Sequence, residues 1–196
     1  MSLPEDFLAH AVRVLDDALV AAVGRARLHL NPDFLARGVA QRLARQMREL
    51  AVMIRRLIFL IALEVELAPV VPRAPGGDAD TRKAHRPECR GFSLVPAPSG
   101  ALPECFRSFT GARATGPVPA ARLFLRWIDL TRVLRAPEAY AKRLAITIRR
   151  WRATGEPKPH VAPMAGRHRF APDLGLIAAA LPGLLAKALG DWPDTG

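Results

Sequence analysis

The amino-acid sequence predicts an all-α protein. Two features support this fold class: apolar residues recur at helical spacing in five stretches, and no stretch makes a convincing β-strand. A proline- and glycine-rich segment separates the first two of these stretches from the last three. We therefore expect a helical hairpin over residues 1–68, an irregular crossover over residues 69–119, and three helices within residues 120–196. The three C-terminal helices are expected to pack on the hairpin as one composite domain.

The first predicted helix covers residues 4–27. Its apolar stripe is narrow and consists of Leu8, Val12, Leu15, Leu19 and Val23. The connection to the next helix, residues 27–31, is short, and short connections favour antiparallel neighbours. The first two helices are therefore expected to form a hairpin.

The second predicted helix is the longest, from Asn31 to Leu67, and the other helices are expected to pack on its apolar arc. Asn31 is a suitable N-cap with Pro32 at the first helical position, and Ala68-Pro69 is a suitable stop. About 36 helical residues have a length of about 54 Å. The apolar arc consists of Leu35, Val39, Leu43, Met47, Leu50, Ile54, Leu57, Ile58 and Ile61. The opposite side carries Arg37, Arg42, Arg45, Arg48, Arg55 and Arg56.

The crossover, residues 69–119, holds nine of the 18 prolines and six of the 14 glycines, and it has no apolar period. Two short apolar patches interrupt it, residues 92–95 and 106–109. These patches either dock on the helical core or bind another molecule, and docking is the commoner fate of isolated apolar residues.

Three further helices are predicted after the crossover. The first runs over about residues 120–135, and its stripe consists of Leu123, Trp127, Leu130 and Leu134. The next begins at Pro137 and stops at Thr154-Gly155, and one face carries Tyr140, Leu144, Ile148 and Trp151. Residues 156–171 are expected to be extended along the surface because of their prolines.

The last predicted helix opens at Pro172-Asp173 and extends to about residue 190. Its inward face consists of Leu174, Ile177, Leu181, Leu184, Leu185 and Ala188. Pro182 lies inside this pattern, so we expect either a kink near Ala179 or two half-helices.

Composition and charge restrict the partners without identifying one. The formal net charge is +11, which favours a polyanionic partner such as nucleic acid. Only four of the 29 basic residues are lysines, however, so an arginine bias of the whole composition is an alternative explanation. The N-terminal residues do not resemble a signal peptide, and there are two cysteines, so we expect a cytoplasmic protein with reduced thiols. The most apolar run, residues 57–63, is too short to span a membrane.

The sequence contains no recognisable catalytic motif, and we expect a protein that is not an enzyme, with no cofactor and no small-molecule substrate. The soft ligands His85, Cys89 and Cys105 are one ligand short of a four-ligand structural zinc site. No metal site is therefore predicted.

The expected function is binding, as an adaptor or regulator that acts through a protein partner or through self-association. Apolar residues off the main stripe of the long helix are the candidate interface: Phe34, Val52, Phe59 and Leu60. The alternative is a nucleic-acid-binding protein that uses basic helix faces and an extended basic arm, including Lys158 and His160. Its candidate contacts are Arg45, Arg48, Arg55, Arg149, Arg150, Arg152, Arg167 and Arg169. Salt sensitivity distinguishes the two functions, because an apolar interface survives salt.

Overall fold

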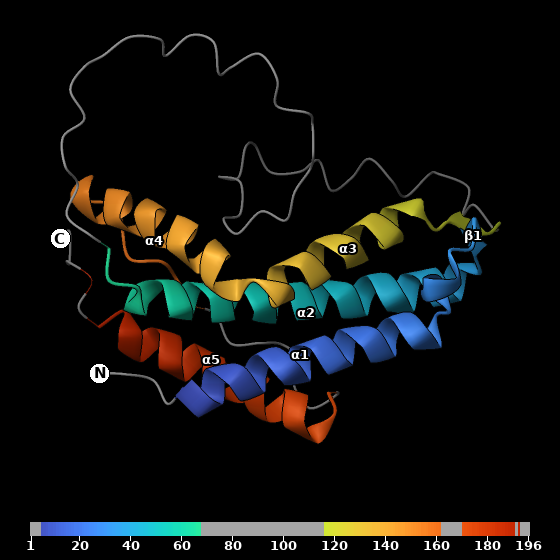
Figure 1. Cartoon of the computed structure of the whole chain (residues 1–196), viewed down its shortest axis with the longest axis horizontal. Helices are drawn as coiled ribbons and strands as arrows, with labels where there is room; N and C mark the ends of the chain where they lie inside the picture. Colours follow the sequence, from blue (N-terminus) through green and yellow to red (C-terminus); the bar gives the residue numbers. More distant parts are fainter. Residues whose placement is uncertain (1–4, 68–115, 162–169, 191, 193–196) are drawn as a thin grey trace, which may run out of the picture.

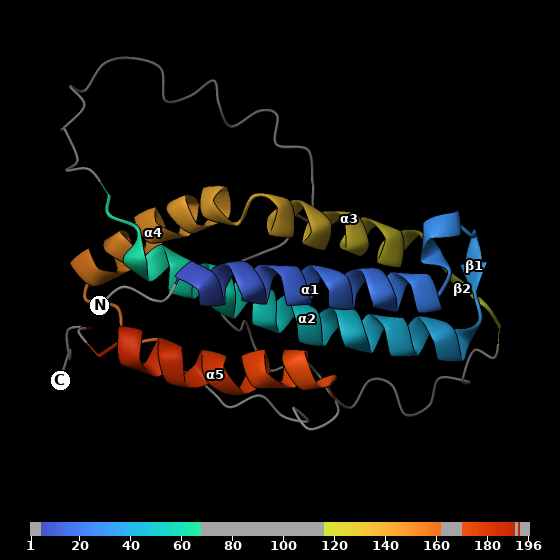
Figure 2. The same ribbon diagram turned by 60° about the horizontal axis from the view of Figure 1, so that its bottom comes forward.

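Helix α2 (Arg37–Glu64) is the centre of the fold, and it contacts each of the other four α-helices of the described chain. The computed structural model describes residues 5–67, 116–161, 170–190 and 192. The other helices are α1 (Glu5–Arg25), α3 (Ala121–Arg135), α4 (Pro137–Ala153) and α5 (Pro172–Ala188). Figures 1 and 2 show α3 and α4 following one another along one side of α2, with α5 on another side, and α1 contacts both α3 and α5. The predicted all-α helical bundle is confirmed.

Helix α2 changes its burial pattern along its length. Its first half has a single buried stripe, whereas from Leu50 onward buried residues occur on more than one face. The second half lies where α4 and α5 cover it in addition to α1. Burying a leucine or isoleucine side chain contributes roughly 1.5–3 kcal/mol, so this half is a main source of stability. The buried residues of this half are Leu50, Ala51, Met53, Ile54, Leu57, Ile58, Leu60 and Ala62.

The start of α2 differs from the prediction. Asn31 is not its N-cap, because Asn31 has φ 50° and ends a short 3₁₀ turn, η1 (Leu28–Leu30). Asparagine tolerates this left-handed conformation, whereas an N-cap residue is usually extended. The chain then forms a two-residue strand, β1 (Phe34–Leu35), and the helix begins only at Arg37.

The expectation of no strand also needs a correction. Strand β1 pairs antiparallel with β2 (Val118–Pro119), with Phe34 opposite Pro119 and Leu35 opposite Val118. The backbone N–H of Ala120 donates to the carbonyl of Asp33 at 3.0 Å and extends this contact. Helical periodicity could not predict the pairing, because its two partners are more than 80 residues apart in sequence.

The C-terminal helices begin and end close to the predicted positions. Pro137 is at the first position of α4, and Gly155 has φ 69° just after the helix, as glycine does at helix ends. On α3 the buried side chains include Val133, whereas Trp127 is only partly buried. The Trp127 ring packs edge-on against Phe124, with the ring centroids 5.5 Å apart.

Helix α5 is continuous through Pro182, so the alternative of two half-helices is wrong, whereas a kink near Ala179 stays a prediction. Proline removes one backbone hydrogen bond, but Leu181 and Leu185 remain buried on either side of it and hold both parts against the core. Segments outside the described residues include the patches 92–95 and 106–109 and the candidate ligands His85, Cys89 and Cys105.

Replacing Pro182 by alanine is expected to raise the free energy of unfolding by about 1–2 kcal/mol. Interior proline costs a helix about 3 kcal/mol, and the extra freedom of the unfolded alanine chain offsets part of the gain. Urea unfolding followed by circular dichroism measures the change. The matched control is Ala179→Ser on the same helix, which is expected to lower stability slightly. A loss of stability in Pro182→Ala would contradict the continuous helix.

Candidate functional site

Charge is distributed unevenly over the bundle. Helices α3 and α4 together carry nine arginines and lysines but only two acidic residues. Helix α2 adds six arginines and two glutamates, whereas α1 carries four acidic residues and two arginines. Because α3 and α4 lie together on one side of α2, that side of the bundle is the basic one (Figure 1).

Three arginines form a cluster where α2 faces α3. Arg126 of α3 lies close enough to Arg48 and Arg55 of α2 for their charges to interact. Burial lowers the pKa of Arg55, and the nearby Arg126 lowers it further. Burial also lowers the pKa of Arg126, with a second contribution from Arg48. We call Arg48, Arg55 and Arg126 the arginine cluster.

The sequence predicts Arg48 and Arg55 as phosphate contacts but does not single out Arg126. Arg122 and Arg126 have the i, i+4 spacing that places two charges on one helix face, and this signal was available. Their position relative to α2 was not available, because it depends on how the two helices pack. The arrangement can bind an anion, since an added negative charge relieves both the repulsion and the cost of burial.

Arg45, another predicted phosphate contact, is engaged within its own helix. Its Nε donates to the Glu49 carboxylate at 3.1 Å. Arg45 is still 54% exposed at its side chain, so this pair is a weak surface interaction. Arg48 Nε donates to the carbonyl of Ala44 at 3.3 Å, which orients this side chain along the helix.

The three predicted arginines at the end of α4 differ in their exposure and contacts. Arg152 lies over the ring of Trp192 at 5.0 Å, and the Trp192 Nε1–H donates to the carbonyl of Glu156 at 3.0 Å. These contacts hold Trp192 against the end of α4. Arg150 is exposed, and Arg149 is partly buried.

The basic arm is described only in part. The structure places Lys158 and His160 on the surface. Arg167 and Arg169 lie outside the described residues, so their role as nucleic-acid contacts stays a prediction.

The four predicted interface residues lie in three different environments. Leu60 is completely buried, so its assignment to a partner surface was wrong. The apolar residues around this part of α2 are covered by the neighbouring helices of the same chain. Val52 and Phe59 are partly buried and line a hollow. Phe34 is 60% exposed and lies near Leu30, which is 67% exposed, beside a separate hollow of about 390 Å³.

The hollow that Val52 and Phe59 line lies between α2, α4, α5 and the segment after α4, and we call it the Arg56 hollow. Its volume is about 330 Å³. Two consecutive arginines of α2 reach it, and most of its other lining is apolar. The lining residues are Val52, Arg55, Arg56, Phe59, Trp151, Pro159, His160, Val161, Leu185 and Leu189.

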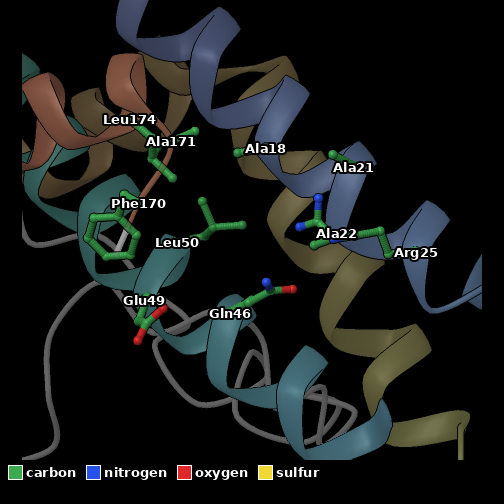
Figure 3. Close-up of a pocket in the computed structure, with 10 residues that line it drawn as sticks. All are labelled: Ala18, Ala21, Ala22, Arg25, Gln46, Glu49, Leu50, Phe170, Ala171 and Leu174. Carbon is green, nitrogen blue, oxygen red and sulfur yellow. The ribbon is translucent and has the colours of Figure 1, made fainter. Parts of the chain in front are cut away.

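A second hollow, of about 340 Å³, lies between α1, α2 and the start of α5. Figure 3 shows Phe170 at one end and Arg25 at the other, with Gln46 and Glu49 on α2. Its lining therefore carries charges of both signs, and α1 contributes three alanines to it. This mixed lining does not select one class of ligand by charge.

Among the residues that the structure describes, no group of three or more metal-ligating side chains is placed to hold an ion. None of the described helices is long and apolar enough to cross a lipid bilayer. Comparison of the chain with models of protein families, with curated proteins and with solved structures finds no match.

Proposed function

We propose that this protein is a non-catalytic helical binding protein whose basic side, formed by α2, α3 and α4, binds nucleic acid. The arginine cluster is the observation that supports this ligand class most strongly. It joins two helices that are more than 50 residues apart in sequence, and it brings three positive charges close together. A cytoplasmic location is part of this proposal.

The physical argument rests on crowding of like charges. Arg126 repels the charges of Arg48 and Arg55, and burial partly desolvates Arg55 and Arg126, so a negative charge placed beside them is favoured. Phosphate groups offer planar pairs of oxygens that match the guanidinium fork. Binding of a phosphate backbone therefore relieves the repulsion and releases condensed counterions.

The direct test is a fluorescence-anisotropy titration of the full chain with a random-sequence DNA duplex and with a single strand. With three phosphate contacts, we expect the duplex affinity to fall about 40-fold between 50 and 200 mM salt. A neutral polymer of similar size is the control ligand. Absence of duplex and single-strand binding even at low salt would contradict the proposal and leave the arginine excess as a compositional bias.

A second candidate function is self-association through the end of the bundle near β1. The exposed Leu30 and Phe34 are the observation that favours it, since two large apolar side chains lie beside a hollow there. Such a patch suits a symmetric dimer, in which the same surface is used twice.

Sedimentation velocity tests this second candidate. Wild-type protein is expected to sediment increasingly as a dimer as its concentration rises, and Phe34→Glu is expected to weaken that dimer at least about tenfold, because it places a charge in the apolar contact. Val20→Glu is the matched control, since Val20 is 59% exposed on α1. A monomer at all concentrations would rule out self-association at this patch.

A further inference from the structure

We propose that the Arg56 hollow binds a small organic anion with an apolar body, such as a medium-chain carboxylate. The sequence predicts no small-molecule substrate, so this ligand class departs from that expectation. The site shares Arg55 with the arginine cluster and is otherwise distinct from it. Its elements are an open, largely apolar hollow of suitable size, two consecutive arginines, and a described lining free of acidic groups.

The walls of the hollow suit the body of such a ligand. Apolar surface comes from α2, α4 and the C-terminal end of α5, through Phe59, Trp151, Leu185 and Leu189. The volume of about 330 Å³ lies within the range of roughly 300–1,000 Å³ that is usual for small-molecule sites. Burial of apolar ligand surface against these side chains supplies the main attraction.

The arginines suit the charged head of the ligand. Arg55 and Arg56 follow one another on α2 and both line the hollow. A guanidinium has five N–H donors, so contacts with neighbouring protein groups leave further donors for a carboxylate. The Arg56 side chain is partly buried, and this burial lowers its pKa. A carboxylate bound there offsets the cost of desolvating the guanidinium. It therefore gains more at this position than at a fully hydrated arginine.

The composition of the lining also excludes other ligand classes. None of the ten described lining residues is acidic, so a cation is not favoured. His160 at the edge adds a further hydrogen-bonding group. The hollow between α1, α2 and α5 lacks this selectivity, because Arg25 and Glu49 both line it.

Isothermal titration calorimetry with three probes separates the roles of head and body. Octanoate has both, 1-octanol has the body without the charge, and acetate has the charge with almost no body. We expect octanoate to bind at least about tenfold more tightly than 1-octanol, because a charge-assisted hydrogen bond is lost in the alcohol. We expect no measurable binding of acetate. Equal binding of octanoate and 1-octanol would overturn the proposal.

Two variants locate the site. Arg56→Gln is expected to weaken octanoate binding about tenfold or more, whereas Arg42→Gln, which removes the same charge from an exposed position of α2, is expected to leave it unchanged. Val52→Phe fills the hollow without a change of charge and is expected to abolish binding. Equal octanoate affinities of wild type and Arg56→Gln would overturn the assignment of the head group.

A measurement on the unaltered chain keeps the test decisive if a variant fails to fold. A photoactivatable diazirine analogue of octanoate is expected to label peptides that contain Trp151, Val161 or Leu185. Labelling confined to other peptides would overturn the proposal. Arg55 belongs to both the hollow and the arginine cluster, whereas Arg56 lies outside the cluster. Duplex binding by Arg56→Gln therefore distinguishes failure of this proposal from failure of nucleic-acid binding.

Discussion

Replacing Arg126 by glutamate is expected to lower the affinity for a random-sequence DNA duplex by about 100-fold at low salt, without a loss of stability. Arg126 lies near both Arg48 and Arg55, so the substitution removes one phosphate contact and turns the other two arginines toward a carboxylate of the protein. A lost charge-assisted contact together with added repulsion accounts for a change of this size. The slope of affinity against salt is expected to fall as well.

The same substitution is expected to raise the free energy of unfolding by up to about 1 kcal/mol. It replaces repulsion among three like charges by attraction, and pairs at a partly exposed site contribute only modestly. A loss of duplex affinity together with a gain in the free energy of unfolding distinguishes a binding cluster from one that only supports the fold. Anisotropy titration and urea unfolding of the same preparation measure the two effects.

Arg132→Glu is the matched control. Arg132 is on α3 as well, its side chain is 66% exposed, and it lies 4.0 Å from Asp129 rather than in the cluster. The substitution changes the net charge by the same amount, and the loss of duplex affinity is expected to be several-fold smaller. Equal losses in the two variants would mean that only net charge matters, and the proposed interface would then be wrong.

Replacing Leu57 by alanine is expected to lower the free energy of unfolding by about 3–4 kcal/mol. Leu57 is only 1% exposed and lies in the half of α2 that α4 and α5 cover. Truncation of a fully buried leucine loses its transfer free energy and leaves a cavity, which together cost about 2–5 kcal/mol. Since domains of this size are stable by about 5–15 kcal/mol, the variant is expected to melt at a clearly lower temperature.

Leu125→Ala provides the comparison for the same chemical change. Leu125 is 63% exposed on α3, and its truncation is expected to alter stability by no more than about 0.5 kcal/mol. Urea unfolding of both variants, with fluorescence and circular dichroism recorded together, measures the difference. Similar small losses in the two variants would show that the second half of α2 is not the packed centre of the bundle.

The local elements were predictable because their signals lie close together in sequence. The apolar spacing of 3.6 residues marks all five helices, and a proline at the first position and a glycine after the last one mark the ends of α4. Such signals depend on neighbouring residues alone. The continuity of α5 through Pro182 departs from them, since burial of the flanking leucines outweighs the local cost of proline.

The candidate sites depended on information that no local pattern contains. A basic stripe in the sequence of one helix indicates that this face is exposed. Which residues of other helices lie beside the stripe depends on how those helices pack. Arg126 joins two arginines of α2 only because α3 packs on α2. Leu60 was assigned to an interface for the same reason: apolar residues on every side of a helix fit either an oligomer or an inner helix, and periodicity is identical in both.

The sequence by itself thus determined the all-α class, the five helices and the central position of the long one. The tertiary structure decided where α2 begins, which of its arginines are partly desolvated, and which residues from distant segments gather at the arginine cluster and the Arg56 hollow. The physical reason is one of range: a helix forms through contacts within a few residues, whereas a binding site forms where side chains of separate helices meet. That meeting depends on how the apolar faces pack together, and packing is a property of the whole chain.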